Sequence, residues 1–397
     1  MGDRTPIEWT DATWTPIRAR RRDHAGGPVT HVGWHCEKVS AGCDNCYAQG
    51  INLRLGTKLP FKPGHLAPRG EVEALLDERM LTAPLRWRRP RRIFVNSMTD
   101  TFGPFVTDDM LDRMFAVMAL CPQHTFQVLT KRPARMREYM SRRDDRERHP
   151  AMRYAALLAM TCQWNTPALD LRLWPLPNVW LGTSIEDQPT ADARIPHLLA
   201  TPAAIRFASA EPLLGRLDLT RVGTIDSVRS AFPDLVQRLA RHMHPHTVNG
   251  VQIEAVGSRF QATTYYQTPD HMGGFEVGSR YYPRLDWVIV GGESGPGARP
   301  MHQDWARSVR DQCVAAGVAF HFKQWGEWEL SLDRDLNDPD WRCDYSNNYV
   351  DRGKSRWLNL AGGCGFHGDR FCVMRRVGKK AAGRLLDGRE WNEVPHD

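Results

Sequence analysis

Short apolar runs recur along this sequence, and each is followed at once by small or polar residues. Stretches with apolar residues at helical spacing lie between the runs, as at residues 108–121, 191–199 and 305–316. Short strands that alternate with helices predict βαβ units and a parallel sheet, and six or seven units fit a closed or partly open barrel. We therefore predict an α/β fold, a partial (β/α)6-type barrel. The apolar runs cover residues 93–96, 126–129, 179–181, 205–208, 287–290 and, more weakly, 318–322.

The alternation is interrupted once and stops near Trp328, which divides the chain. The interruption contains HMHPH, TTYYQT and several glycines, and we interpret it as an insertion with a small β-rich part. After Trp328 the chain turns polar and ends in a basic segment at residues 374–391, which predicts an extension that closes over the barrel. The predicted divisions are the first part of the barrel with the cysteine loop (1–216), the insertion (217–283), the last part of the barrel (284–330) and the C-terminal extension (331–397).

Polar side chains follow most of the predicted strands, at the end of the strand where barrel enzymes carry their working residues. Asp100 is suited to bind a ribose hydroxyl or to cap the helix that starts near Thr107, and Lys131 to meet a carboxylate or phosphate or to remain solvated. Glu293 lies in a Gly-rich turn, GGESGPG, whose spacing is not that of a dinucleotide fingerprint. The strand-end candidates are Thr99, Asp100, Lys131, Ser184, Glu186, Glu211 and Glu293, with His321, Lys323 and Gln324 as further candidates at the barrel mouth.

Three cysteines lie close together in HCEKVSAGCDNCYA with the spacing C-x6-C-x2-C. The thiolates of Cys36, Cys43 and Cys46 can surround one soft metal centre. A closed zinc site would need a fourth ligand, for which His31 or His35 is available. Three thiolates alone suit a 4Fe–4S cluster with one iron left open, where S-adenosylmethionine can chelate through its amino and carboxylate groups.

Segments spread over nearly the whole chain resemble a radical-SAM-related family of phage and bacterial proteins, largely of unknown function. The chain is similar at greater distance to the spore photoproduct lyase branch. The resemblance implies a partial triosephosphate-isomerase-type barrel, a 4Fe–4S cluster and bound S-adenosylmethionine, although the cysteine spacing departs from the common C-x3-C-x2-C. The matching segments are IEWTDATWTP, VSAGCDNCYA, FVNSMTDTFGP, LTKRP, NVWLGTSIED, RFASAEPLLG, LDWVIVGGESGPGARPM, FKQWGEW and RVGKKAAGRLLDGREW.

The cysteines and the resemblance together predict a radical-SAM enzyme that cleaves S-adenosylmethionine reductively to a 5′-deoxyadenosyl radical. Tyr47 follows the third cysteine and either packs beside the adenine or anchors the loop in the core, while Ser184 and Glu186 suit the ribose and the methionyl amine. Such an enzyme needs an external electron donor, flavodoxin-like or ferredoxin-like. The rival interpretation is a non-catalytic, zinc- or cluster-stabilised nucleic-acid-binding protein, which explains the cysteines and the charge but not the polar strand ends.

The net charge of +7 is concentrated in two basic groups, at residues 18–22 and 86–92. Such groups either meet phosphate backbones or remain solvated, so DNA or RNA is a candidate substrate, and modification of a base would suit the distant similarity. No apolar run approaches the ~18 residues of a membrane span, and the start lacks a signal-peptide core. We therefore expect a cytoplasmic protein without a membrane segment.

Nine cysteines in a reducing compartment predict metal ligands or buried thiols rather than disulfides. A second group of cysteines lies in the C-terminal extension, with His367 near it. Because the spacing of these cysteines is scattered, we interpret them as ordinary thiols rather than a metal site. That group comprises Cys343, Cys364 and Cys372; the predicted core thiols are Cys121, Cys162 and Cys313.

Overall fold

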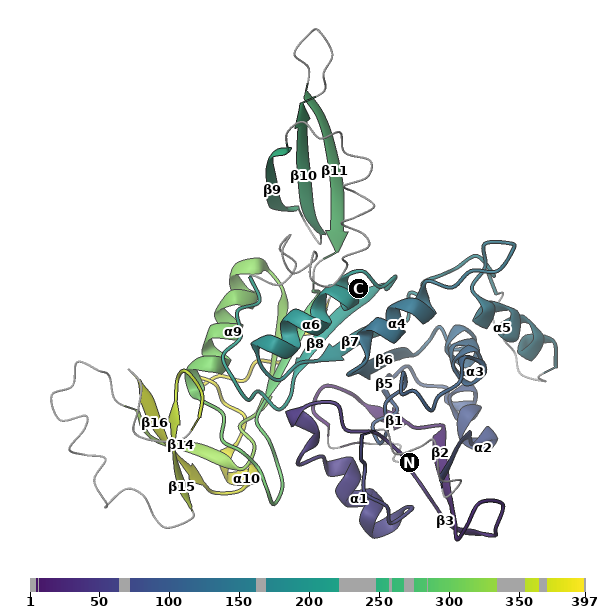
Figure 1. Ribbon diagram of the computed structural model, residues 1–397, viewed down its shortest axis with the longest axis horizontal. Helices are drawn as coiled ribbons and strands as arrows, with labels where there is room; N and C mark the ends of the chain where they lie inside the picture. Colours follow the sequence, from purple (N-terminus) through teal and green to yellow (C-terminus); the bar gives the residue numbers. More distant parts are fainter. Residues whose placement is uncertain are drawn as a thin grey trace, which may run out of the picture.

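Seven parallel strands form one sheet that curls into a half-barrel (Figure 1). In the computed structural model, the described residues are 5, 7–63, 72–161, 169–220, 248–256, 259–267, 275–283, 285–333, 354–363 and 370–395. The strands lie in the order β1-β5-β6-β7-β8-β12-β13, and every neighbouring pair is parallel. This confirms the predicted fold class. The strands are β1 (Ala12–Trp14), β5 (Arg92–Val95), β6 (Thr125–Thr130), β7 (Val179–Ser184), β8 (Ile205–Ala210), β12 (Trp287–Gly291) and β13 (Ala319–Gln324).

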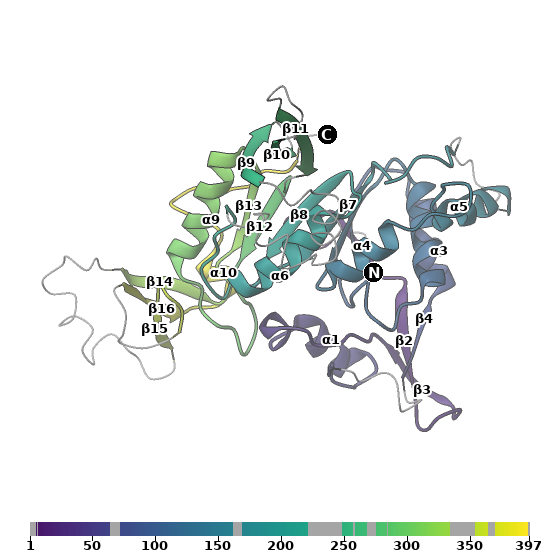
Figure 2. The same cartoon turned by 45° about the horizontal axis from the view of Figure 1, so that its top comes forward.

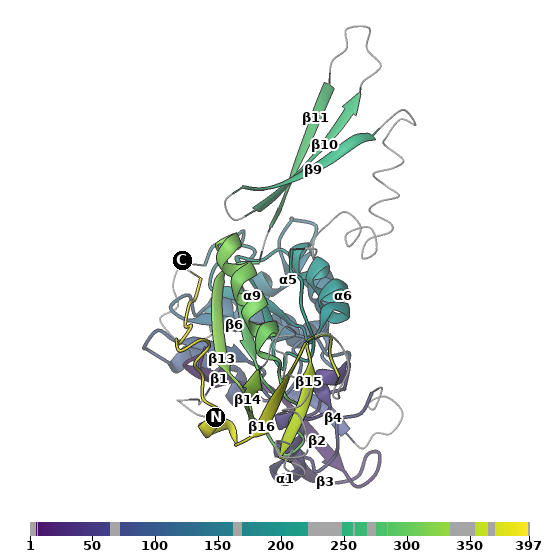
Figure 3. The same cartoon turned by 90° about the vertical axis from the view of Figure 1, so that its left-hand side faces the viewer.

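Helices cover the outer face of the half-barrel, and two separate cores lie beneath them (Figures 1 and 3). One core joins the outer side of β5 and β6 to three helices, and the other joins β8, β12 and β13 to two more. The sequence sets the helix ends locally: in the helix that follows β7, Asp187 and Thr190 form a reciprocal capping box. The covering helices are α3 (Asp108–Ala119), α4 (Pro133–Met140), α5 (Pro150–Thr161), α6 (Gln188–Leu199) and α9 (Gln303–Ala316).

The inner face of the half-barrel is filled by aromatic side chains near the amino ends of the strands. Trp9 lies across this end, with its ring centroid 4.7 Å from that of Phe94 and 6.1 Å from that of Trp287. Phe207 and Trp180 complete the layer, at 5.7 and 5.9 Å from Trp287. Because side chains alternate along a strand, the same strands supply this floor and both outer cores.

Three smaller antiparallel sheets surround the half-barrel. The sheet β3-β2-β4 and the short helix α1 (Tyr47–Leu55) lie on one side of the strand ends, and β14-β16-β15 lies on the other (Figures 1 and 2). The third sheet, β11-β10-β9, lies within the predicted insertion and projects away from the half-barrel (Figure 3). The strands are β2 (Ile17–Arg22), β3 (Val29–Gly33), β4 (Val72–Leu76), β9 (Val248–Val256), β10 (Arg259–Gln267), β11 (Phe275–Pro283), β14 (Trp328–Asp333), β15 (Ser355–Asn359) and β16 (Phe371–Arg376); short helical turns are η1 (Ala41–Cys43), α2 (Glu78–Leu81), η2 (Ala83–Arg86) and α10 (Lys379–Ala382).

The strand β1 was not predicted, because its three residues are too few to form an apolar run. It is ordered by parallel pairing with β5, in which Ala12 lies opposite Ile93. The other six strands of the parallel sheet and the helices α3, α6 and α9 agree with the predicted runs to within a few residues. The strands of the sheets β3-β2-β4 and β14-β16-β15 were not predicted. No helix among the described residues is long and apolar enough to cross a membrane.

Candidate functional site

The three clustered cysteines lie on one loop that leads into α1. Cys43 ends the short turn η1, and Cys46 is the residue that precedes the first turn of α1. Cys36 and Cys46 pack against a small apolar cluster that contains Met98, and Thr99 binds the carbonyl of His35. Met98 and Thr99 follow β5, so the loop lies at the carboxyl ends of the parallel strands. All three side chains are half-buried, and all are free thiols.

The thiols lie close enough to influence one another's ionisation. Burial raises the pKa of Cys36 well above its usual range, and the charges of Asp100 and Cys46 raise it further. Burial also raises the pKa of Cys46, an effect opposed by the N–H groups that begin α1 and by Lys131. Neutral thiols are therefore favoured at Cys36 and Cys46 until a positive centre stabilises the thiolates.

No group of three or more His, Cys, Asp and Glu side chains within the described part of the chain has the compact arrangement that one metal ion needs. A single zinc ion at Zn–S distances of about 2.3 Å would hold its sulfur ligands within roughly 4 Å of each other. A cluster of several irons spreads its cysteine ligands more widely. The loop therefore gives no support to a closed mononuclear zinc site.

Glu186, which follows β7, has no exposed surface and lies beneath the cysteine loop. It accepts hydrogen bonds from Ser40 Oγ (2.8 Å) and Arg194 Nη1 (3.0 Å), and it pairs with Lys131. Burial raises the pKa of the carboxyl, but the two cations outweigh burial, so the pKa falls below its usual value. A Cβ atom at Gly42 would lie 2.5 Å from Glu186 Oε1, so the loop backbone rests directly on this carboxylate.

Glu293, which follows β12, holds the other flank of the same loop. Its Oε2 accepts hydrogen bonds from Asn45 Nδ2 (3.0 Å) and from the backbone N–H of Arg299 (2.8 Å). The Arg299 guanidinium binds Glu293 and also donates to the carbonyl of Ala41 at 2.8 Å. Glu186 and Glu293 therefore contact neighbouring parts of the loop from two different strands.

Asp100 is also buried; the N–H of Phe102 donates to it at 2.9 Å, and its other partners lie at the carboxyl end of β6. It accepts hydrogen bonds from Thr130 Oγ1 (2.6 Å), the backbone N–H of Lys131 (3.0 Å) and Arg132 Nη1 (3.0 Å). The alternative that Asp100 caps the next helix is wrong, because Thr107 caps α3 by accepting from the N–H of Met110. Asp100 instead fixes the two basic residues that lie near Cys36 and Cys46.

Glu211, which follows β8, has the fewest partners among the strand-end carboxylates. It accepts from Ser209 Oγ at 3.1 Å, and its Oε1 lies 3.0 Å from Lys323 Nζ without the alignment of a hydrogen bond. Its side chain is 13% exposed, against 0% for Glu186. Glu211 therefore retains hydrogen-bonding capacity that the other carboxylates have already used.

Tyr47 is the first residue of α1, and its side chain reaches the segment that follows β5. Its hydroxyl donates to the carbonyl of Ser97 at 2.5 Å, and Glu211 is among the charges that raise its pKa. The residue keeps 55% of its surface exposed, and desolvation of the phenol raises its pKa. Tyr47 therefore does not lie in a core, although its hydroxyl ties α1 to the segment that follows β5.

Some of the remaining predicted residues lie near the cysteine loop, and others lie away from it. Thr99 Oγ1 donates to the carbonyl of His35 at 2.5 Å, beside Cys36. Ser184 is nearly buried at the end of β7. The Gln324 side chain donates to the carbonyl of Gly292 in the Gly-rich turn and accepts from the N–H of Gly326. His321 lies deeper, with its ring 6.0 Å from that of Trp287. Cys121 and Cys313 are buried as predicted, and Cys372 is buried on β16. The remaining predicted residues lie outside the described residues: Cys162, Cys343, Cys364 and His367.

Several residues of the site were not singled out in the sequence, although each lies beside a predicted one. Arg132 follows Lys131 directly, and Arg299 follows the Gly-rich turn of Glu293. Arg194 lies on α6, eight residues after Glu186, and its guanidinium donates to Glu186 and to the carbonyl of Ser184. A carboxylate predicted to be buried requires a cation, and that rule applied to each motif would have selected all three arginines.

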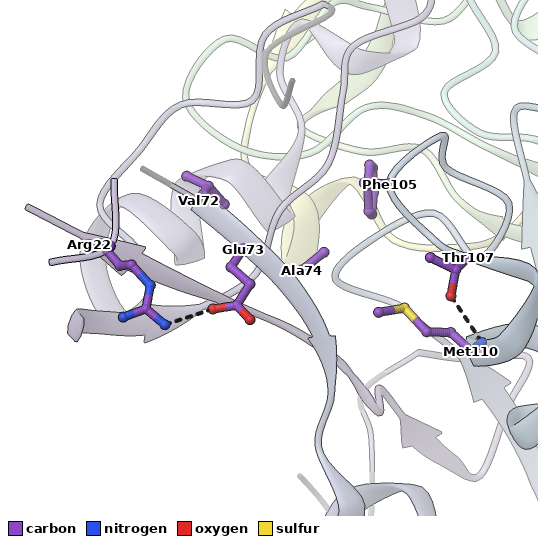
Figure 4. A pocket seen from close by; sticks show the side chains of 8 residues that line it. Arg22, Val72, Glu73, Ala74, Phe105, Thr107 and Met110 are labelled. Carbon is purple, nitrogen blue, oxygen red and sulfur yellow. Dashed lines mark hydrogen bonds and ion pairs between the residues drawn. The ribbon is translucent and has the colours of Figure 1, made fainter. Parts of the chain in front are cut away.

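A separate hollow of about 600 Å³ lies between the β2–β4 pair and the segment that enters α3 (Figure 4). Arg22 and Glu73 form an ion pair at 3.0 Å on one side of it, and Phe105 and Met110 lie opposite. No thiol and none of the strand-end carboxylates lines this hollow. The polar strand ends under the cysteine loop are therefore the better candidate for the site of chemistry.

The fold and the site together define a parallel α/β half-barrel protein whose three-cysteine loop lies over buried strand-end carboxylates. The sequence pattern of a family described as "Protein of unknown function (DUF5131)" matches residues 4–395. The chain belongs to this family. No curated protein and no solved structure matches the chain.

Proposed function

We propose that this protein is a radical-SAM enzyme, related to the radical-SAM proteins that its sequence resembles. The observation that carries the proposal is the position of the three cysteines, on one loop at the carboxyl ends of a parallel half-barrel. Working residues of βα barrels lie at this end because the loops there converge on one space.

The donor set fits an iron–sulfur cluster better than a harder metal ion. Cys36, Cys43 and Cys46 would be its ligands, since thiolates are the ligands that Fe–S clusters take in proteins. Lys131 and Arg132 act on these thiols with favourable charge and would offset the negative charge of a thiolate-bound centre. When bound and reduced by a flavodoxin-like or ferredoxin-like donor, a 4Fe–4S cluster supplies one electron that cleaves the S–C5′ bond of S-adenosylmethionine and yields a 5′-deoxyadenosyl radical.

The chain's own residues would bind and orient the polar parts of S-adenosylmethionine. Glu211 is best suited to the amino group, because one of its oxygens lacks an aligned hydrogen bond. Lys131 is 18% exposed and can reach a carboxylate while Arg194 continues to neutralise Glu186. Tyr47 offers an accessible ring for adenine. Ser184 and Thr99 complete the polar wall, while Asp100 would act through Lys131 and Arg132.

A nucleic-acid base is the substrate class that the charge favours. Arg20 and Arg21 lie on β2, in the sheet beside α1, and the guanidinium of Arg18 stacks 4.3 Å from the ring centroid of Trp34. Trp34 is half-buried, and an arginine stacked on an aromatic ring is a common feature of surfaces that bind single-stranded nucleic acid. Arg22 contributes less to this surface because Glu73 neutralises it.

Anaerobic reconstitution tests the proposal directly. We expect about four irons and matching sulfide per chain, as for one cubane cluster, and formation of 5′-deoxyadenosine and methionine from S-adenosylmethionine with dithionite. Cys36→Ala, Cys43→Ala and Cys46→Ala should abolish both. Cys121→Ala is the matched control, because Cys121 is buried far from the loop in sequence and should leave both unchanged.

Stoichiometric zinc without sulfide would instead support the rival, a zinc-stabilised nucleic-acid-binding protein. An intact cluster that neither binds nor cleaves S-adenosylmethionine would make the cluster structural or purely electron-transferring. Either result ends the radical-SAM proposal.

A further inference from the structure

The residues between Cys36 and Cys43 form the contacts that join the cysteine loop to two strand ends. Ser40 donates to Glu186, and the backbone at Gly42 lies against the same carboxylate. The carbonyl of Ala41 accepts from Arg299, which is itself held by Glu293. Just beyond Cys43, Asn45 donates to Glu293 and to the carbonyl of Gly297.

We propose that the six-residue gap is an anchoring segment, and that Glu186 and Glu293 are positioning residues that fasten the cysteine loop to β7 and β12. This role rests on the proposed function only in assuming that the cysteines are metal ligands. It differs from a direct role in binding S-adenosylmethionine, because neither carboxylate has free surface to offer. Glu186 is 0% exposed and Glu293 is 6% exposed.

The chemistry of these two carboxylates suits an anchor. Each is buried and is held by an arginine through a charged hydrogen bond, so each has a fixed position. Bonds to a rigid strand end hold a loop more firmly than bonds to another loop would. The loop is held on both flanks of Cys43, by Glu186 through Ser40 and by Glu293 through Asn45 and Arg299.

The anchoring role also accounts for the unusual length of the gap. A three-residue gap after Cys36 would end at Val39 and would omit Ser40, Ala41 and Gly42. Those three residues supply the contacts to Glu186 and Arg299. The longer spacing therefore adds attachment points and leaves the number of thiols unchanged.

A glycine pair provides the first test in the metal-free, reduced full-length protein. Gly42→Ala places a methyl group against Glu186, whereas Gly50→Ala on the adjacent α1 meets nothing within 4 Å. We expect Gly42→Ala to speed iodoacetamide alkylation of Cys43 and Cys46 about tenfold, because overpacking makes local opening more frequent. Gly50→Ala should alkylate at the wild-type rate.

A hydroxyl pair tests the bond itself. Ser40→Ala removes the donor to Glu186, and Ser40→Thr keeps it. We expect faster alkylation and faster amide hydrogen exchange over residues 38–46 in the alanine variant, and rescue in the threonine variant. Asn45→Asp, which opposes a carboxylate to Glu293, should loosen the loop in the same way.

Buried Cys121 and Cys313 serve as internal standards, since their protection reports an intact fold. Wild-type alkylation rates in both Gly42→Ala and Ser40→Ala would overturn the anchoring proposal. Because both tests use metal-free protein, their results are independent of the iron analysis. A loop that loosens as expected in a protein that takes up no iron would uphold the anchor and reject the radical-SAM function.

Discussion

The two ends of the half-barrel are built from the same strands with opposite chemistry. At the amino ends, Trp9 and Trp287 pack with Phe207 in an aromatic floor. At the carboxyl ends, buried carboxylates pair with basic residues beneath the cysteine loop. The inward-facing side chains of β8 and its end change from aromatic to charged within a few residues. They are Phe207, then Ser209, and then Glu211, which directly follows the strand.

The difference separates stability from chemistry within one sheet. The floor buries large apolar surface and fixes how the strands curl around it. The mouth carries charges that burial makes costly unless each has a partner, and it retains one carboxylate, Glu211, that is not fully bonded. We therefore expect substitutions in the floor to change the free energy of unfolding most, and substitutions at Glu211 to change chemistry most.

The largest effect on stability is expected in the floor. Trp287→Ala should lower the free energy of unfolding by about 3–5 kcal/mol, because it removes a fully buried ring at the centre of the aromatic layer. Urea unfolding followed by circular dichroism measures this loss. Leu55→Ala, at a residue that is 66% exposed, is the control and should stay within about 0.5 kcal/mol. Equal losses in the two variants would remove the distinction between floor and surface.

An intermediate effect is expected at the boundary between the floor and the mouth. Burial, together with the charges of Arg384 and Lys323, lowers the pKa of His321 to about 4. The unfolded chain takes up this proton near pH 6.5, so the contribution is fully present above that pH and is lost as the pH falls towards 4.

The lost stability should approach about 1.4 kcal/mol per pH unit for this residue. His321→Leu should flatten the pH dependence of the unfolding free energy between pH 6.5 and 4 by that amount. If His321→Leu leaves the pH dependence of the unfolding free energy unchanged, the folded protein accepts the proton on His321. The surroundings of His321 would then be more accessible to water than its burial indicates.

The smallest effect on stability is expected at Glu211. Glu211→Gln should change the free energy of unfolding by about 1 kcal/mol or less, since Lys323 is 20% exposed and can turn towards water. The same substitution at Glu186 should cost more than at Glu211, because Arg194 is only 9% exposed and cannot turn towards water as Lys323 can.

For 5′-deoxyadenosine formation, Glu211→Gln should cause a loss of about 10-fold to 100-fold, as expected for a lost charged hydrogen bond to a ligand. The cluster content should remain that of the wild type. A variant with normal cleavage would show that Glu211 does not bind S-adenosylmethionine.

Much of the fold could be predicted from local sequence. The apolar runs, their polar ends and the helical spacing between them indicate a parallel sheet, because each pattern depends on neighbours a few residues away. The cysteine spacing likewise places three thiols on one loop. The short β1 was missed because its strand character depends on β5 rather than on its own three residues.

The roles of the strand-end carboxylates were decided by tertiary structure. Glu186, Glu211 and Glu293 end three strands in the same way, so the sequence identifies all three as candidates and does not rank them. Their differences come from partners far along the chain: Ser40 lies 146 residues from Glu186, and Asn45 lies 248 residues from Glu293. Such contacts form only when the sheet curls and brings the cysteine loop over its carboxyl end, and burial, which sets the cost of an unpaired charge, exists only after that step.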